Sequence, residues 1–274
     1  MHDMFPESLK PYQQIIEATA MPSVLLSFKE EATALHQSKI GGTPYFPYDY
    51  PWDIFYLPHP ARVNDTPWPK DPKTGKELML LLQLNFAEVP SLPLFPQQGI
   101  LQLFVDDGNW HHLDEQLHVI YHPDVFTEKE LQFTEFNNPT DSYRVPERAI
   151  AFHPDVEYMT ASDFRFSRTL PEQAFVTDRN LWIDFLSITD HRYSKQQKEF
   201  EYGFNKIGGY HYSQNGQDPR KNLPEWHDSV LLVQFEDYDT GLEWGDGGSA
   251  QFFIKKTDLA ALNFQDLLFH WDST

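Results

Sequence analysis

Two lysines stand close before paired glycines, one in each half of the chain. The first lies in Ser38-Lys39-Ile40-Gly41-Gly42 and the second in Asn205-Lys206-Ile207-Gly208-Gly209. Successive glycines can turn backbone N–H groups toward one point, and a lysine adds positive charge, so this pattern could bind an anion. A tight turn beside an exposed lysine explains the same residues. We favour the turn, because neither copy carries the Gly-x-x-x-x-Gly-Lys-Ser/Thr pattern of a phosphate-binding loop.

Two glutamines interrupt apolar runs of strand length. Gln83 lies in the run from 78 to 84, and Gln234 in the run from 229 to 236. A buried amide needs hydrogen-bond partners. Either the two amides face a cleft between the halves and bind a peptide or sugar, or each fixes the backbone of a neighbouring loop. We favour the second alternative, because an unpaired buried amide costs about 1 to 3 kcal/mol.

If the halves do form a shared cleft, we predict that its polar lining is drawn from the residues that recur in both. These ligand-binding candidates are Lys39, Gln83, Lys206 and Gln234. The lysines would favour an anionic group on an acidic protein. With both lysines at the surface, charge reversal is expected to weaken binding and leave stability nearly unchanged.

The best candidate for a metal-binding cluster follows the apolar run from 229 to 236 that carries Gln234. It consists of Asp237, Asp239, Glu243 and Asp246. Alternate carboxylates before a glycine suit a hard cation such as calcium, but the twelfth residue from Asp237 is Gly248 rather than the glutamate of a calcium loop. We therefore interpret residues 237 to 248 as a turn between two strands, and we predict no metal and no cofactor.

No pattern predicts catalysis. The histidines His111, His112, His118 and His122 lack the helical His-Glu-x-x-His spacing of a zinc site, and no Gly-x-Ser-x-Gly sequence is present. We predict no catalytic residue. Paired carboxylates for glycoside hydrolysis stay open, because their separation is spatial. Trp52, Trp68, Trp110, Trp226 and Trp244 could stack on sugars.

The same features recur in order, which indicates a duplicated unit. Gln102 follows Gln83 by 19 residues, and Gln251 follows Gln234 by 17. We predict an α+β fold of mainly antiparallel sheets with a few flanking helices, in a single domain over 1–274 with repeats at about 20–125 and 175–270. Expected strands lie at 23–28, 78–84, 100–105, 118–121, 229–236 and 250–254, and expected helices lie at 7–19, at 195–203 and from 257 onward.

Composition limits the function classes. The chain has 41 acidic and 21 basic residues, a formal charge of −20 and no cysteine. Such a charge disfavours nucleic acid, and the absence of cysteine excludes disulfides and a cysteine nucleophile. No apolar stretch reaches bilayer length and no secretory signal is evident, so we expect a cytoplasmic protein without membrane contact.

Six short sequences together resemble the bacterial YwqG-like family, also called the DUF1963 domain. They are Ser38 to Pro44, Leu81-Leu82-Gln83, Lys206 to Tyr210, Leu232-Val233-Gln234, Trp244 to Gly248, and Phe252 to Ile254 leading to Asp258-Leu259. The resemblance covers about residues 7 to 268 and implies a duplicated α+β fold. It supplies no established function and no catalytic residues. The chain departs from the family pattern at Glu236 to Asp239 and at Phe269-His270-Trp271.

We therefore expect a non-enzymatic binding protein that recognises a protein partner, in an immunity or regulatory role. The acidic charge and the proline- and aromatic-rich stretch at 44–72 support this expectation. The alternative is a hydrolase or carbohydrate-binding protein that uses a cleft between the two repeats. The oligomeric state is left open.

Overall fold

The structure is a computed structural model that describes residues 5–47, 68–71, 73–75, 77–105, 117–134, 145–190, 205–213, 215–236, 240, 242 and 244–273. Its strands form one ten-stranded sheet in the order β10-β9-β8-β7-β1-β6-β2-β3-β4-β5. The strands are β1 (Met21–Lys29), β2 (Lys39–Ile40), β3 (Met79–Asn85), β4 (Ile100–Val105), β5 (His118–His122), β6 (Arg148–Glu157), β7 (Lys206–Gly208), β8 (Ser229–Glu236), β9 (Ser249–Lys255) and β10 (Leu267–Asp272).

Short helices accompany the sheet, so the α+β prediction is confirmed. They are η1 (Glu7–Tyr12), α1 (Gln13–Glu17), η4 (Lys129–Leu131), α3 (Phe166–Thr169), α4 (Glu172–Thr177), α5 (Arg179–Thr189), η6 (Pro219–Asn222), η7 (Pro224–Trp226) and α6 (Lys256–Ala260). Among the described residues, no helix is long and apolar enough to cross a membrane.

The chain divides into two compact units. Unit 1 contains Met1–Ser27, Pro90–Phe95 and Phe152–Thr274, and unit 2 contains Phe28–Val89 and Pro96–Ala151. Strands β1 and β6 contribute to both, since the unit boundaries fall within them.

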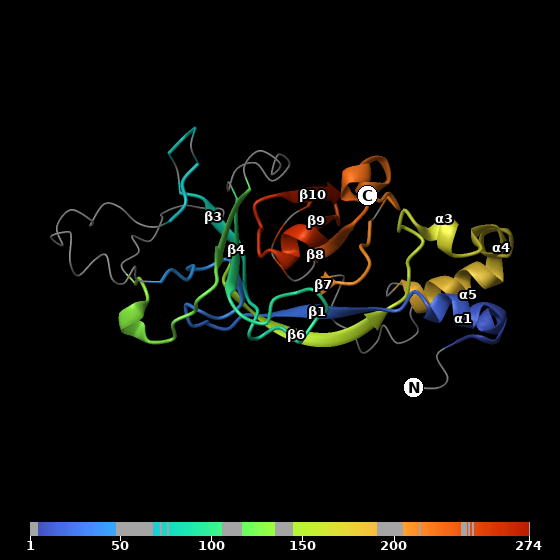
Figure 1. Ribbon diagram of the computed structural model, residues 1–274, viewed down its shortest axis with the longest axis horizontal. Coiled ribbons are helices and arrows are strands. Elements are labelled where there is room, and N and C mark those ends of the chain that lie inside the picture. The colour runs from blue at the N-terminus through green and yellow to red at the C-terminus, as the bar shows by residue number, and fades with distance from the viewer. Residues whose placement is uncertain are drawn as a thin grey trace. The chain divides into compact units, whose positions relative to one another are not determined.

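Unit 1 combines antiparallel strands with a helical cluster. Figure 1 shows β8, β9 and β10 side by side, and β9 pairs antiparallel with both of the others. The helical cluster packs around aromatic rings, with Phe175 stacked on Phe185 at 4.7 Å between ring centroids. Asp178 is the N-cap of helix α5, and its side chain accepts hydrogen bonds from the backbone N–H groups of Asn180 and Leu181. Such a cap satisfies free N–H groups of the first turn.

Unit 2 is built on β2, β3, β4 and β5, each antiparallel to its neighbour. Strands β3 and β4 are buried along their whole length, which explains their nearly continuous apolar sequences. Phe46, Leu78, Leu80 and Phe104 form a core cluster on one face of these strands.

The predicted strands are confirmed, with small shifts at their ends. The expected helix at 7–19 begins as the 3-10 helix η1, which contains Pro11, and continues as α1. The helix expected from 257 onward is present as α6, with Lys255 as its N-cap. Phe269-His270-Trp271 lies in strand β10. The helix expected at 195–203 lies outside the described residues.

Candidate functional site

The predicted residues of unit 2 meet on neighbouring strands. Lys39 of β2 lies opposite Gln83 of β3, and Gln83 lies opposite Gln102 of β4. The Oε1 atom of Gln83 accepts the backbone N–H of Tyr45 at 2.8 Å, and Gln102 Nε2 donates to the Tyr45 carbonyl at 2.6 Å. Gln83 Nε2 donates to the carbonyls of Leu35 and Gln37, both at 2.7 Å. Both polar backbone groups of Tyr45 are thus held by glutamines.

Unit 1 repeats this geometry. Lys206 of β7 lies opposite Gln234 of β8, and Gln234 lies opposite Gln251 of β9. Gln234 Oε1 accepts the backbone N–H of Tyr212 at 2.8 Å, and Gln251 Nε2 donates to the Tyr212 carbonyl at 2.9 Å. Each first glutamine strand thus has an antiparallel partner that carries the second glutamine. All four glutamines are fully buried.

Both lysines are buried as well, so the expectation that they are surface residues is wrong. Lys39 is 1% exposed and Lys206 is 2% exposed. Lys206 Nζ lies 2.8 Å from Oε2 of the buried Glu157. Lys39 Nζ instead donates to the carbonyls of Ala34 at 3.0 Å and Thr43 at 3.1 Å. Burial lowers the pKa of Lys39 to about 8, against the opposing effects of Glu147 and Glu88.

The paired glycines form tight turns at positive φ, as the favoured interpretation predicts, but the lysines beside them are buried and not exposed. Gly208 and Gly209 have φ values of 68° and 69°. The Glu157 carboxylate packs directly against Gly209. A Cβ added at Gly209 would lie 2.5 Å from Glu157 Oε2. That oxygen accepts the backbone N–H of Tyr210 at 2.9 Å. The group held by the lysine and the turn in unit 1 is therefore the chain's own carboxylate.

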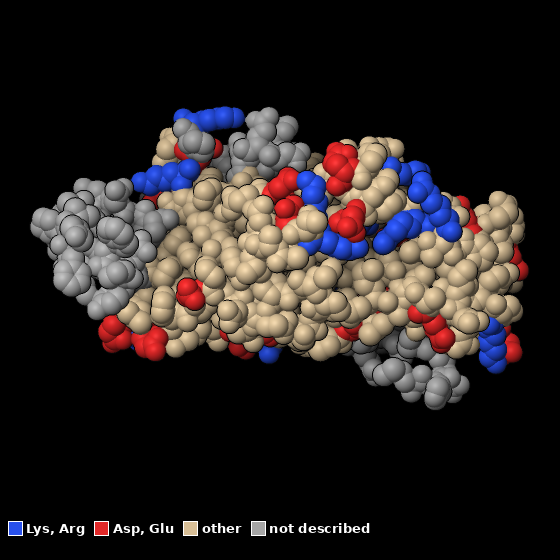
Figure 2. All heavy atoms as spheres, in the orientation of Figure 1, with Lys and Arg blue, Asp and Glu red and all other residues tan. Residues whose placement is uncertain are grey.

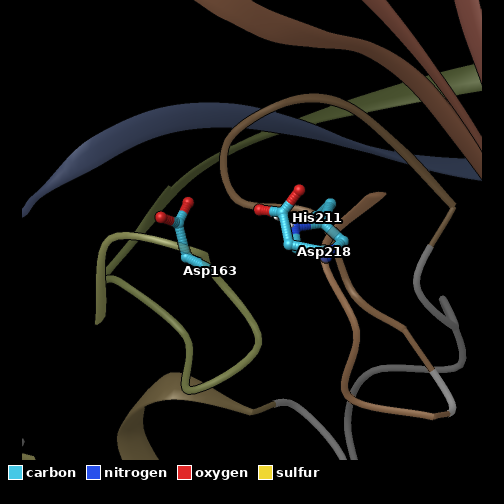
Figure 3. A group of neighbouring side chains, drawn as sticks. All are labelled: Asp163, His211 and Asp218. Atoms are coloured by element: carbon cyan, nitrogen blue, oxygen red, sulfur yellow. Dashed lines mark ion pairs between the residues drawn. The ribbon is translucent and has the colours of Figure 1, made fainter. Parts of the chain in front are cut away.

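A further polar cluster lies in unit 1, at positions that the sequence analysis did not select. It contains Asp163, from the loop after β6, with His211 and Asp218 from the segment between β7 and η6. Figure 3 shows Asp218 beside the His211 ring and Asp163 on its separate loop. All three side chains are buried, and their ligand atoms lie within 4.8 Å of one another. This spacing would allow a metal ion to bind. Whether it can depends on whether the carboxylate oxygens already accept hydrogen bonds from other groups.

Arginine donors already occupy those oxygens. Asp218 accepts from the backbone N–H, Nε and Nη2 of Arg220 and from the backbone N–H of Phe164. Asp163 accepts the same three donors from Arg165, with Arg220 Nη2 a fourth at 3.5 Å. A carboxylate offers about four lone-pair sites, so both are filled. A divalent cation would have to displace two arginines, and the cluster therefore fits an arginine–carboxylate network better than a metal centre.

His211 is the remaining member of this cluster. Its ring nitrogens have no hydrogen-bond partner, although Nδ1 lies 3.5 Å from Asp218 Oδ2. Burial lowers the pKa of His211 to about 4, against the opposing effect of Asp218. The ring is therefore neutral at physiological pH and packs against Phe253, with 5.8 Å between ring centroids. The sequence did contain a signal for this network, namely the repeated Asp-x-Arg at 163–165 and 218–220.

Of the remaining metal, histidine and tryptophan candidates, the structure describes only some. Asp237, Asp239, Glu243, His111, His112, Trp52 and Trp110 lie outside the described residues, whereas Asp246 lies in an exposed bend before β9. Trp68, Trp226 and Trp244 are at most 8% exposed, which removes the support these three gave to sugar stacking. His122 Nε2 lies 3.1 Å from Gln102 Oε1, and burial lowers its pKa to about 4. His122 thus extends the glutamine network of unit 2.

The model of one protein family, described as a domain of unknown function (DUF1963), matches residues 59–273. The chain belongs to the DUF1963 family. The match covers more than half of the chain and includes Gln83, Lys206 and Gln234. No curated protein matches the sequence. The family resemblance expected from the short sequences is therefore confirmed.

Proposed function

We propose that this DUF1963 protein is a non-enzymatic binding protein that recognises a protein partner, in an immunity or regulatory role. One observation carries the proposal: the polar residues whose spacing suggested chemistry are buried, and the glutamines among them are bonded to the backbone. Gln83 and Gln102 hold Tyr45, and Gln234 and Gln251 hold Tyr212. Residues used in this way fix the shape of loops. Rigid loops favour recognition, because little conformational entropy is lost on binding.

Charge supports a protein partner. The chain carries a formal charge of −20, which favours encounter with a basic surface and disfavours phosphate backbones. Figure 2 shows the acidic side chains of one face in separate groups, with basic side chains gathered near α3. The choice of partner would then depend on these local acidic and basic patches and not on the net charge alone. We keep the cytoplasm as the proposed compartment, and the YwqG-like branch and a bacterial source as proposals from the resemblance.

We call Gln83 with Gln102 the glutamine centre of unit 2, and Gln234 with Gln251 the glutamine centre of unit 1. We also infer that these two centres derive from an internal duplication. The Lys–Gln and Gln–Gln pairs have the same register in both, and each first glutamine strand has an irregularity just before its glutamine, at Leu80/Leu82 and at Leu231/Val233. Superposing residues 38–105 on residues 205–254 should place Gln83 on Gln234. Equivalent strands of different order or direction would contradict the duplication.

The functional proposal is tested by partner capture combined with activity screening. The tagged full chain is expected to recover a specific protein from a lysate of its source, at a constant ratio after purification of the complex. A general screen for hydrolysis of esters, peptides and glycosides should show no turnover above the buffer rate. Recovery of no protein above background, together with a measured turnover, would show that the proposal is wrong.

A further inference from the structure

Phe126 is an unusual surface residue of unit 2. It lies in the loop between β5 and η4, and its side chain is 38% exposed. Among the described residues, the exposed large apolar side chains are Ile15, Leu94, Phe126, Val156, Val176, Ile183 and Leu262, of which Phe126 alone is aromatic. Aromatic residues, Phe included, are enriched at the cores of protein interfaces.

Two buried side chains hold the backbone of Phe126 in place. Its N–H donates to the Tyr45 hydroxyl oxygen at 2.9 Å, and its carbonyl accepts from Gln132 Nε2 at 2.8 Å. Tyr45 is fully buried and Gln132 is 6% exposed. Tyr45 is in turn the residue that Gln83 and Gln102 hold at both backbone groups. The glutamine centre of unit 2 thus ends in a loop that presents an exposed ring on a fixed backbone.

The same loop is acidic. Asp124, Glu128 and Glu130 are exposed around Phe126 in sequence, against the single cation Lys129. An acidic segment of this kind attracts a basic surface and speeds its encounter. It repels a second copy of this chain, because each copy carries a formal charge of −20. The charge therefore selects a basic partner over self-association.

We propose that Phe126, with Asp124, Glu128 and Glu130, is a docking site for a basic protein segment that offers an apolar pocket to the ring. This inference rests on the proposed function and specifies where the partner binds. The ring would supply the buried anchor, and the carboxylates would supply orientation and the rate of encounter. The braced backbone means that the loop need not be ordered when the partner arrives.

The direct test uses a defined probe, a fluorescent peptide of alternating Lys and Leu segments, with a control peptide in which Ser replaces every Leu. Fluorescence anisotropy is measured on the full chain at about 50 mM and about 300 mM salt, which brackets strong and weak screening. We expect Phe126→Ala to weaken Lys/Leu binding by about tenfold or more, as for an interface anchor. We expect no such loss with the Lys/Ser peptide.

Two further variants complete the test. Val176→Ala removes an apolar side chain that is 53% exposed in unit 1, and should change binding by less than about twofold. The triple variant Asp124→Asn, Glu128→Gln, Glu130→Gln should lose affinity mainly at low salt. Thermal unfolding should be unchanged in all variants. Wild-type affinity in Phe126→Ala, or an equal loss in Val176→Ala, would overturn the docking site.

Partner capture separates failure of the site from failure of the function. If wild type and Phe126→Ala recover the same protein equally, the docking site is wrong and the proposed function stands. If neither recovers a protein, the activity screen shows turnover and the peptide does not distinguish the variants, both proposals are wrong. A protein recovered by wild type, and lost together with peptide binding in Phe126→Ala, supports both.

Discussion

Lys206 in unit 1 and Lys39 in unit 2 occupy matching positions opposite a glutamine, but their ammonium groups have different partners. Lys206 contacts the Glu157 carboxylate at 2.8 Å, whereas Lys39 donates to two backbone carbonyls. The carboxylate nearest the unit 2 turn, Glu147, is bonded instead to Thr33. One register therefore allows two ways of burying a lysine. The Lys206 charge is balanced by the Glu157 carboxylate. Among the described residues, the Lys39 charge has only carbonyl partners, so burial disfavours it and lowers the pKa of Lys39.

The largest expected effect is loss of the ion pair in unit 1. Glu157→Gln keeps the shape of the side chain but leaves the buried Lys206 charge without its carboxylate. Removing one partner of a buried pair costs about 3 to 5 kcal/mol. We expect a decrease of that size in the free energy of unfolding, measured by urea denaturation at pH 7.

A matched control is available in unit 2. Glu30 pairs with Arg148 at 3.3 Å, but its side chain is 80% exposed. Exposed pairs contribute about 0 to 1 kcal/mol, so Glu30→Gln should have little effect. Equal losses in the two variants would show that the Lys206 pair is not special and would remove the contrast between the units.

The next effect concerns the pH dependence of Lys39. Its pKa is lowered from 10.5 to about 8, so between these values the unfolded chain binds more protons than the folded protein. The free energy of unfolding therefore rises with pH across this window. The rise contributed by Lys39 is about 3 kcal/mol. Lys39→Met should lose it, as measured by urea denaturation of both proteins from pH 7.5 to 10.5. Parallel pH profiles would contradict the lowered pKa.

A third effect tests how tightly the Glu157 carboxylate occupies its turn. Gly209→Ala would place a Cβ 2.5 Å from Glu157 Oε2 and 2.8 Å from the Cβ of Ser23, at a φ of 69°. Gly216→Ala imposes the same backbone strain at a φ of 66°, with no atom within 4 Å. Crowding of this kind costs about 1 to 3 kcal/mol, so thermal unfolding should show Gly209→Ala to be less stable than Gly216→Ala by about 2 kcal/mol. Similar losses would mean that Glu157 moves aside easily.

The strands and their glutamines could be predicted from the sequence because the signal is local. A polar residue inside a buried apolar run must bond to something, and a neighbouring loop was the favoured partner. The burial of the lysines could not be predicted in the same way. Glu157 is 49 residues from Lys206, and nothing near either residue indicates the pair. The loop-fixing interpretation of Gln83 and Gln234 is supported by their contacts, whereas their predicted role as ligand-binding residues stays a prediction.

The helical cluster and the arginine–carboxylate network also escaped the sequence analysis. Helix α5 places Leu181, Phe185 and Thr189 four residues apart on its buried face, but other apolar residues lie between them and obscure the period. The network joins a loop after β6 to one before η6, so only the fold brings Asp163 and Asp218 together. The Asp-x-Arg repeat indicated two local pairs and could not indicate that they meet.

The smallest effect concerns the glutamines themselves. Gln83 accepts from the Tyr45 N–H and from Gln102 Nε2 and donates to two carbonyls, whereas Gln234 accepts from the Tyr212 N–H and its Nε2 has no partner in the described part of the chain. Both Gln→Leu variants leave a buried backbone N–H unpaired, which costs about 1 to 3 kcal/mol. Gln83→Leu also removes the acceptor of one Gln102 N–H. Gln83→Leu also frees the carbonyls of Leu35 and Gln37.

Because Leu35 is only half-buried and Gln37 is exposed, water can replace part of what those two carbonyls lose. The extra cost of Gln83→Leu over Gln234→Leu should therefore arise mainly from the buried Gln102 N–H and amount to about 1 to 2 kcal/mol. Urea denaturation measures the difference, and hydrogen exchange should place the additional loss of protection in residues 34–46. A larger loss for Gln234→Leu would mean that unit 1 depends on its glutamine more than its contacts indicate, and the two centres would then differ in the opposite sense.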